Sequence, residues 1–236
     1  MADPLVLLPG LMSDARVFWP QIAELSAKTA VTVAPITQGE RIEEIASGLL
    51  DQLPKRFALA GMGLGGAVAL EILRRAPDRL SRLALIGASP LAEPPQAAAA
   101  REMLIVKVKS GRLGDAMREE LDPLWLAPGP NRAAILEIAM DMADTLGPEV
   151  YIRQARALQR ACDQQAVLRK CKVPTLVMCG EVGKLNPVKR HSFMAELLPY
   201  AILRVIEGAG HLPTLEQPEA TTAAIKEWMK MPLTPA

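Results

Sequence analysis

The chain has 236 residues, of which 50% are hydrophobic and 22% are charged, and its formal net charge is +1 at pH 7. This length and apolar content allow one large α/β core. A nearly neutral chain without a basic block is not expected to bind nucleic acid or a membrane surface. No apolar run approaches the roughly 20 residues that a membrane-spanning helix needs.

The cysteines and the N-terminus bear on the cellular compartment. Cys162, Cys171 and Cys179 are odd in number and lack the spacing of metal ligands. We expect them to be reduced thiols and predict no metal site. The segment from Met1 to Pro4 has no basic stretch followed by a long apolar one, so no signal peptide is expected. We therefore expect a cytoplasmic protein, either a monomer or a homodimer.

Short runs rich in Val, Ile, Leu and Ala predict β-strands that are buried on both faces of a parallel sheet. The six runs are Leu5–Leu8, Val31–Ala34, Phe57–Ala60, Leu83–Ile86, Thr175–Cys179 and Ile202–Ile206. Amphipathic stretches alternate with them and predict helices. These stretches are Arg16–Lys28, Glu43–Leu53, Leu64–Arg75, Val188–Leu197 and Glu219–Met229. The alternation predicts an α/β fold with a doubly wound, mostly parallel sheet of about six strands.

The alternation stops between about Ser89 and Lys172, where the sequence contains no convincing strand. This stretch predicts several helices, which are interrupted at Gly111, at Pro128–Pro130 and at Gly147. A helical insertion between two strands is typical of a cap above the carboxyl edge of the sheet, where ligands bind in open α/β folds. We assign residues 1–89 and 173–236 to the core and residues 90–172 to a helical cap, or lid. A merely structural helical subdomain is the alternative.

The hexapeptide Gly61–Gly66, which reads GMGLGG, lies between the predicted strand Phe57–Ala60 and the predicted helix Leu64–Arg75. A strand, a tight glycine turn and a helix are the setting of a nucleophile elbow, G-x-S-x-G. The central position holds Gly63, which has no side chain and cannot attack a substrate. The elbow is therefore predicted to lack its nucleophile.

The same hexapeptide also matches the dinucleotide fingerprint G-x-G-x-x-G. A lone match is a weak signal, because the fingerprint needs an Asp or Glu at the end of the next strand to hold a ribose. The next predicted strand, Leu83–Ile86, is followed by Gly87, Ala88 and Ser89, without a carboxylate. We favour the elbow and expect no cofactor.

Two backbone N–H groups are predicted to face the crevice at the strand ends. Pro9 and Gly10 follow the first strand and allow a sharp turn that leaves the N–H of Leu11 pointing into the crevice. Leu64 starts the helix after the elbow, so its N–H has no acceptor within the helix and lies at the positive end of the helix dipole. Two such groups facing each other form an oxyanion hole.

The chain contains two histidines, His191 and His211. His211 follows the last predicted strand, after Gly208 and Gly210, which allow a close approach, and this position suits a general base that reaches over the sheet edge. His191 falls in an amphipathic helix, where we expect a solvated or capping side chain. His211 is therefore the candidate site residue.

These motifs together resemble the α/β-hydrolase fold family, in particular its short bacterial serine esterases, over essentially the whole chain. Leu8–Leu11 resembles the oxyanion loop, Gly61–Gly66 the elbow G-x-S-x-G-G, Pro174–Gly183 the acid-bearing stretch P-T-L-V-x-x-G-E-x-D, and Gly208–His211 the histidine loop G-x-G-H. The resemblance implies acyl transfer to water through a Ser-His-Asp triad. It also implies a small-molecule ester, thioester or lactone as substrate.

The chain departs from this family pattern at two of the three triad positions. Gly63 stands at the nucleophile position and Gly183 at the acid position, so only His211 remains. Glu181 lies two residues before the vacant acid position, but its side-chain direction or solvent exposure argues against a substitute role. Little or no triad activity is therefore expected.

The supporting glycines and the oxyanion loop are retained around both gaps. This retention favours an inactivated or redesigned form of a working serine hydrolase. The alternative is a natural, non-catalytic ligand-binding pseudo-hydrolase with a pocket under the cap. In that case Trp125, Leu126, Met140 and Met142 are candidates to line the pocket, although such residues at helical spacing also fit a simple core.

Overall fold

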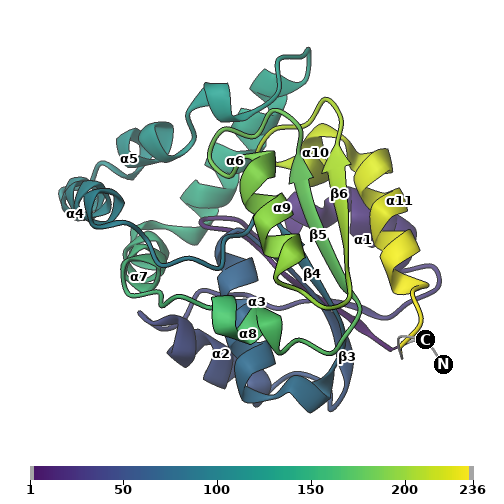
Figure 1. Ribbon diagram of the computed structural model, residues 1–236. Coiled ribbons are helices and arrows are strands. Elements are labelled where there is room, and N and C mark those ends of the chain that lie inside the picture. The colour runs from purple at the N-terminus through teal and green to yellow at the C-terminus, as the bar shows by residue number, and fades with distance from the viewer. Residues whose placement is uncertain (1–2, 234–236) are drawn as a thin grey trace.

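The computed structural model describes residues 3–233, so residues 1 and 2 of the segment inspected for a signal peptide lie outside it. A six-stranded parallel sheet runs through the molecule in the order β2-β1-β3-β4-β5-β6 (Figure 1). Its strands are β1 (Leu5–Leu8), β2 (Val31–Val33), β3 (Phe57–Met62), β4 (Leu80–Ile86), β5 (Thr175–Gly180) and β6 (Ala201–Ile206). The predicted α/β fold is confirmed.

Alternate residues of the strands face opposite layers of helices. Val6 and Leu8 of β1 pack into the apolar cluster that includes α2, α3, α8 and α9, whereas Leu5 and Leu7 pack into the cluster that includes α1 and α11. Because both faces are covered, every residue of β1, β3, β4 and β5 is buried. The helices are α1 (Trp19–Leu25), α2 (Ile42–Leu50), α3 (Leu64–Arg75), α8 (Gln165–Arg169), α9 (Val188–Glu196), α10 (Pro213–Glu216) and α11 (Pro218–Met229).

Strand β4 begins at Leu80, three residues before the predicted start at Leu83. The added residues include Ser81 and Arg82, which are polar and nevertheless buried. The Arg82 guanidinium donates to the carbonyl oxygen of Met231, a residue 149 positions away. An apolar pattern does not reveal a polar residue whose partner comes from the far end of the chain.

Residues 90–172 form only helices and loops, and most of them lie on the side of the molecule away from α11 (Figure 1). Their helices are α4 (Pro95–Lys109), α5 (Leu113–Glu120), α6 (Arg132–Leu146), α7 (Pro148–Gln159) and α8, with the short 3-10 helix η3 (Pro123–Trp125). Side chains of α4 to α7, among them Ile105 and Tyr151, form an apolar cluster of their own. Leu168 of α8 instead packs into the core beside α3. Within residues 3–233, no helix is long and apolar enough to cross a membrane.

Candidate active site

Gly63 forms the turn between β3 and α3, and its backbone has a φ of 50° and a ψ of −114°. Residues with a Cβ rarely adopt this region, whereas glycine enters it without a steric penalty. The N–H of Gly63 donates to the carbonyl oxygen of Ile86 on β4 at 2.9 Å and so ties the turn to the sheet. A strand, a sharp turn and a helix thus follow one another as an elbow requires, with glycine at the centre.

Gly65 lets the start of α3 pack directly against the loop after β1. A Cβ on Gly65 would lie 2.3 Å from the carbonyl oxygen of Leu8 and 2.4 Å from that of Pro9, so no larger residue fits. Leu11 of this loop and Leu64 of α3 line the same cavity. Among the residues that the structure describes, their backbone N–H groups have no hydrogen-bond acceptor. Two free donors therefore border one cavity.

The loop after β1 is also held by Gln154 of α7, a residue to which no sequence motif points. The buried Gln154 accepts the N–H of Met12 at 2.8 Å and donates to the carbonyl oxygen of Ile36 at 3.0 Å. Met12 has a φ of 49°, an unusual value for a residue other than glycine. One buried amide thus stabilises the strained loop, and no local pattern distinguishes Gln154 from other polar helix residues.

His211 follows β6 and lines the same cavity as Gly63. Its ring meets that of Trp125 edge-on, with 6.2 Å between the ring centroids. Burial, with a smaller effect from His191, lowers the pKa of His211 to about 4. An adjacent carboxylate would raise this pKa, but within residues 3–233 none hydrogen-bonds to the ring. The imidazole is therefore neutral at pH 7 and only a weak base.

Glu216 of α10 shapes the loop around His211 and was also not anticipated. Its carboxylate accepts the N–H groups of Gly210 at 2.8 Å and Leu212 at 2.7 Å, the two residues that flank the histidine. It also accepts the N–H of Ala127, between η3 and α6, at 2.7 Å. One carboxylate thus joins the histidine loop to the helical segment above it.

Gly183 lies beside the histidine loop, in the turn after β5. The N–H of the preceding residue, Val182, donates to the carbonyl oxygen of Ala209 at 3.0 Å. A Cβ on Gly183 would lie 3.4 Å from the carbonyl oxygen of Gly180 and 3.5 Å from that of Gly210, which are ordinary contact distances. Position 183 therefore has room for a side chain beside Gly210, the residue before His211.

Glu181 does not fill the gap left at position 183. Its exposed carboxylate accepts the backbone N–H of Gly208 at 3.2 Å. The side chain therefore supports the far end of the histidine loop.

The expectation of a solvated or capping His191 is wrong. Its exposed fraction is 0%, because it lies with Met194 on the buried side of α9, the helix that covers β5 and β6. Its Nδ1 lies 3.3 Å from the carbonyl oxygen of Pro187, and its Nε2 has no partner among the described residues. Burial lowers the pKa of His191, so the ring is neutral at pH 7.

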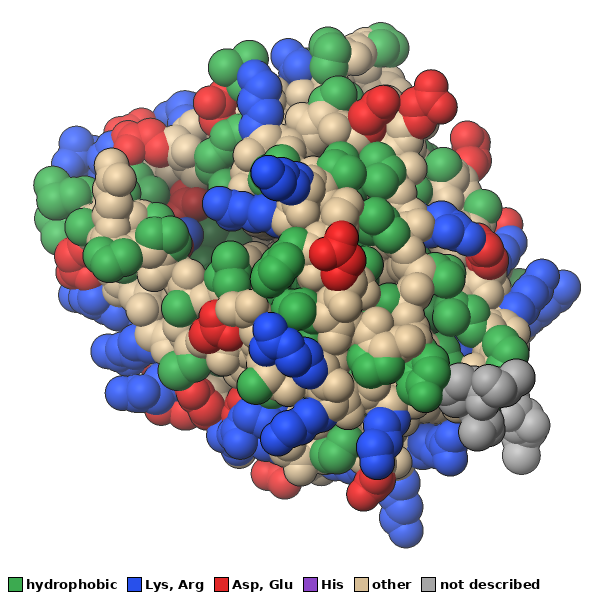
Figure 2. Space-filling view, viewed as in Figure 1, with side chains coloured by type: hydrophobic (Ala, Val, Ile, Leu, Met, Phe, Trp, Pro, Cys, Tyr) green, Lys and Arg blue, Asp and Glu red, His purple; other side chains and the backbone are tan. Residues whose placement is uncertain are grey.

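A cavity of about 340 Å³ brings these groups together between the sheet edge and the helices of residues 90–172. Figure 2 shows the hollow beside these helices, with acidic side chains inside it and basic side chains at its rim. Trp125 lines it, whereas Leu126, Met140 and Met142 pack into the apolar clusters instead. Glu93, Arg101 and Glu120 also line it, and no sequence motif had pointed to them.

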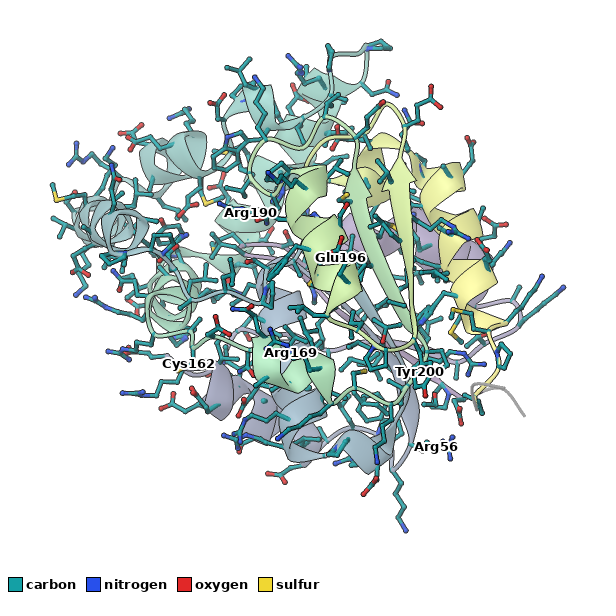
Figure 3. All side chains as sticks on the ribbon, in the orientation of Figure 1. Arg56, Cys162, Arg169, Arg190, Glu196 and Tyr200 are labelled. Atoms are coloured by element: carbon teal, nitrogen blue, oxygen red, sulfur yellow. The ribbon has the colours of Figure 1, made fainter. Side chains whose placement is uncertain are left out.

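In the described part of the chain, no three His, Cys, Asp or Glu side chains are grouped so that they could hold a metal ion. The three cysteines are free thiols. Cys162 is exposed near α8 (Figure 3), and Cys171 and Cys179 are buried. Burial raises the pKa of Cys179 to about 11, so this thiol is protonated at pH 7.

A parallel sheet with a sharp turn between its third strand and the next helix, a histidine loop after its last strand and helices inserted between two strands define the class of α/β-hydrolase folds. The family model described as "Alpha/beta hydrolase family" matches residues 5–225. The chain belongs to this family.

Relatives extend the similarity over most of the chain. The pimeloyl-(acyl-carrier protein) methyl ester esterase of Aromatoleum aromaticum is 29% identical over 203 residues, which cover 80% of each protein. A thermophilic esterase from Thermogutta terrifontis, solved with malate bound, is 27% identical with a TM-score of 0.89, over 98% of this chain and 90% of that one. The enol-lactonase from Burkholderia xenovorans shares the fold, with a TM-score of 0.83 and 22% identity over 98% and 93% of the two chains.

Proposed function

We propose that this chain is an ester-hydrolase scaffold that lacks its nucleophile and its acid, in an inactivated or redesigned form. Its substrate class is a small-molecule ester, thioester or lactone, in keeping with the esterase and lactonase names of its relatives. The observation that carries the proposal is the backbone of Gly63, which has the unusual φ and ψ of an elbow turn although no side chain there requires them.

The intact reaction assigns a role to each position of the cavity. A serine at position 63 would attack the acyl carbon, and His211 would take its proton. An aspartate at position 183 would orient the imidazole, and the N–H groups of Leu11 and Leu64 would hold the oxyanion. With glycine at both positions the acyl-enzyme route is closed. In a serine protease, loss of a triad member leaves roughly 10³–10⁴-fold catalysis over water.

We also propose that residues 90–172 act as the cap of this site. Two features support this role: the segment lines one side of the cavity, and its backbone hydrogen-bonds to both the histidine loop and Glu216. The cap would exclude water from the acyl group and select its length.

The test is a restoration series assayed with p-nitrophenyl acetate, butyrate and octanoate. We expect negligible turnover for the unchanged chain, partial turnover for Gly63→Ser, and full recovery for Gly63→Ser combined with Gly183→Asp. His211→Ala in the doubly restored chain is the control and should remove the recovered activity. A fluorophosphonate probe should label only the chains with serine at position 63. An inert, unlabelled double variant would reject the proposal.

The alternative is a natural protein that binds a ligand without turning it over. The observation in its favour is the open cavity, whose wall contains charged side chains, among them Arg101 and Glu120, that are not at triad positions. This function predicts that the unchanged chain binds an ester tightly, while the doubly restored chain remains inert at every acyl length.

A further inference from the structure

Three charged side chains of the cap form one connected group in the cavity wall. Arg101 of α4 donates through Nε and Nη2 to Glu93 Oε1, at 3.0 Å and 2.6 Å, and through Nη1 to Glu120 Oε1 at 2.6 Å. The hydroxyl of Tyr151 on α7 also donates to Glu120 Oε1, at 2.8 Å. Burial raises the pKa of Tyr151, so the phenol stays a neutral donor. The four side chains therefore hold one another in place.

The connected side chains have one negative charge that no positive charge among them neutralises. Glu93 and Glu120 supply two carboxylates against the single guanidinium of Arg101, and all three side chains are at most 15% exposed. Arg190 also lines the cavity, but it is exposed in the first turn of α9, at the rim (Figure 3). Solvent screens a rim charge strongly, so Arg190 does not cancel the inner excess.

One oxygen of this group has no partner. Both hydrogen bonds to Glu120 end on Oε1, and among the described residues no donor reaches Oε2. The Glu120 side chain is nine-tenths buried, and it borders the cavity that also contains Gly63 and His211. Oε2 is not among the fully buried atoms, so it opens to the cavity, where it can accept a charge-assisted hydrogen bond from a positively charged ligand group.

We propose that Glu120 binds the cationic end of the ligand, so that this cavity takes esters that carry a primary ammonium group away from the ester carbonyl. This inference rests on the proposed function, because it names the substrate class of the same cavity. It excludes a carboxylate at that end of the ligand. Arg101 is already surrounded by two carboxylates, and a third would add repulsion without a free cation to balance it.

Binding to the unchanged chain tests the proposal without any need for turnover. The probes are methyl 6-aminohexanoate, its neutral isostere methyl heptanoate, and monomethyl pimelate, which ends in a carboxylate, together with homologues one and two carbons shorter and longer. Isothermal titration should show that the amino ester of the best length binds at least about tenfold more tightly than its neutral isostere. The carboxylate ester should bind most weakly.

The matched variants are Glu120→Gln and Glu119→Gln. Glu119 is the neighbouring carboxylate of α5; it is 56% exposed and lies outside the cavity. Glu120→Gln should remove the preference for the amino ester, and Glu119→Gln should keep it. The proposal is overturned if the neutral or acidic ester binds as tightly as the amino ester at every length, if no ester binds, or if the preference survives in folded Glu120→Gln. If the amino ester is not preferred, the chain with Gly63→Ser and Gly183→Asp can still recover turnover. The two proposals can therefore be rejected independently.

Discussion

The backbone N–H of His211 donates to the carbonyl oxygen of Trp125 at 2.8 Å, which joins the histidine loop to η3 of the helical segment. The contact depends on Gly210. A Cβ at that position would lie 2.3 Å from the Trp125 carbonyl oxygen and 2.8 Å from the nitrogen of Ala127. Two segments that are far apart in the sequence thus meet at a point where only glycine leaves enough space.

Gly210→Ala should therefore push the histidine loop away from the helical segment. We expect it to lower the free energy of unfolding by about 1–3 kcal/mol, the usual cost of overpacking, as measured by urea denaturation. In the doubly restored chain it should also reduce esterase activity. Gly129→Ala is the control, because a Cβ there meets nothing within 4 Å. If the two variants have the same free energy of unfolding, the histidine loop can move away from the helical segment without a cost in stability.

Gly63→Ser should lower the melting temperature or leave it unchanged. Space is not the obstacle, since the nearest atom to an added Cβ is the Cα of Gly10 at 3.9 Å. The cost lies in the backbone, where a residue with a Cβ pays on the order of 1–3 kcal/mol in this region. Gly48→Ser is the matched control, because Gly48 lies in helix α2 and an added Cβ there meets nothing within 4 Å. It should leave the melting temperature unchanged or raise it. A clear rise in the melting temperature of Gly63→Ser would contradict this account.

Gly183→Asp should raise the pKa of His211 from its value of about 4. A carboxylate within about 4–6 Å of the ring favours the protonated imidazole and typically shifts a pKa by 1–3 units. NMR titration of the ring protons measures the shift. Gly183→Asn has nearly the same shape without the charge, so it should leave the pKa low. If the two variants titrate alike, the side chain at position 183 does not reach the imidazole.

The protein should lose stability as the pH falls from about 6.5 towards 4. The pKa values of His191 and His211 are both lowered in the folded state, so in this window the unfolded chain binds more protons. The stabilisation is therefore complete above the ordinary histidine pKa of about 6.5 and is lost below it, by on the order of 1–3 kcal/mol. Urea denaturation at pH 7.5 and pH 5 measures the difference, and His191→Leu should make it smaller. An unchanged free energy of unfolding at pH 5 would contradict the prediction.

Much of the fold could be predicted because it depends on local patterns. The apolar runs located all six strands, and the helix Leu64–Arg75 has the predicted ends. The turn at Gly63 was recognisable because glycines between a strand and a helix are a local signature. The missed part of β4, at Ser81 and Arg82, is polar and is buried only because distant residues cover it.

The features of the site also fall into those that the sequence predicts and those that it does not. The sequence by itself determined that Gly63 and Gly183 have no side chains, and that Leu11, Leu64 and His211 follow strand ends that meet at one edge of a parallel sheet. Only the tertiary structure decided that His191 is buried, that Gln154 and Glu216 hold the two loops, and that Glu93, Arg101 and Glu120 share the cavity wall. The reason is physical: backbone turns depend on neighbours in the chain, whereas the burial and pairing of a polar side chain depend on partners that folding brings from far away.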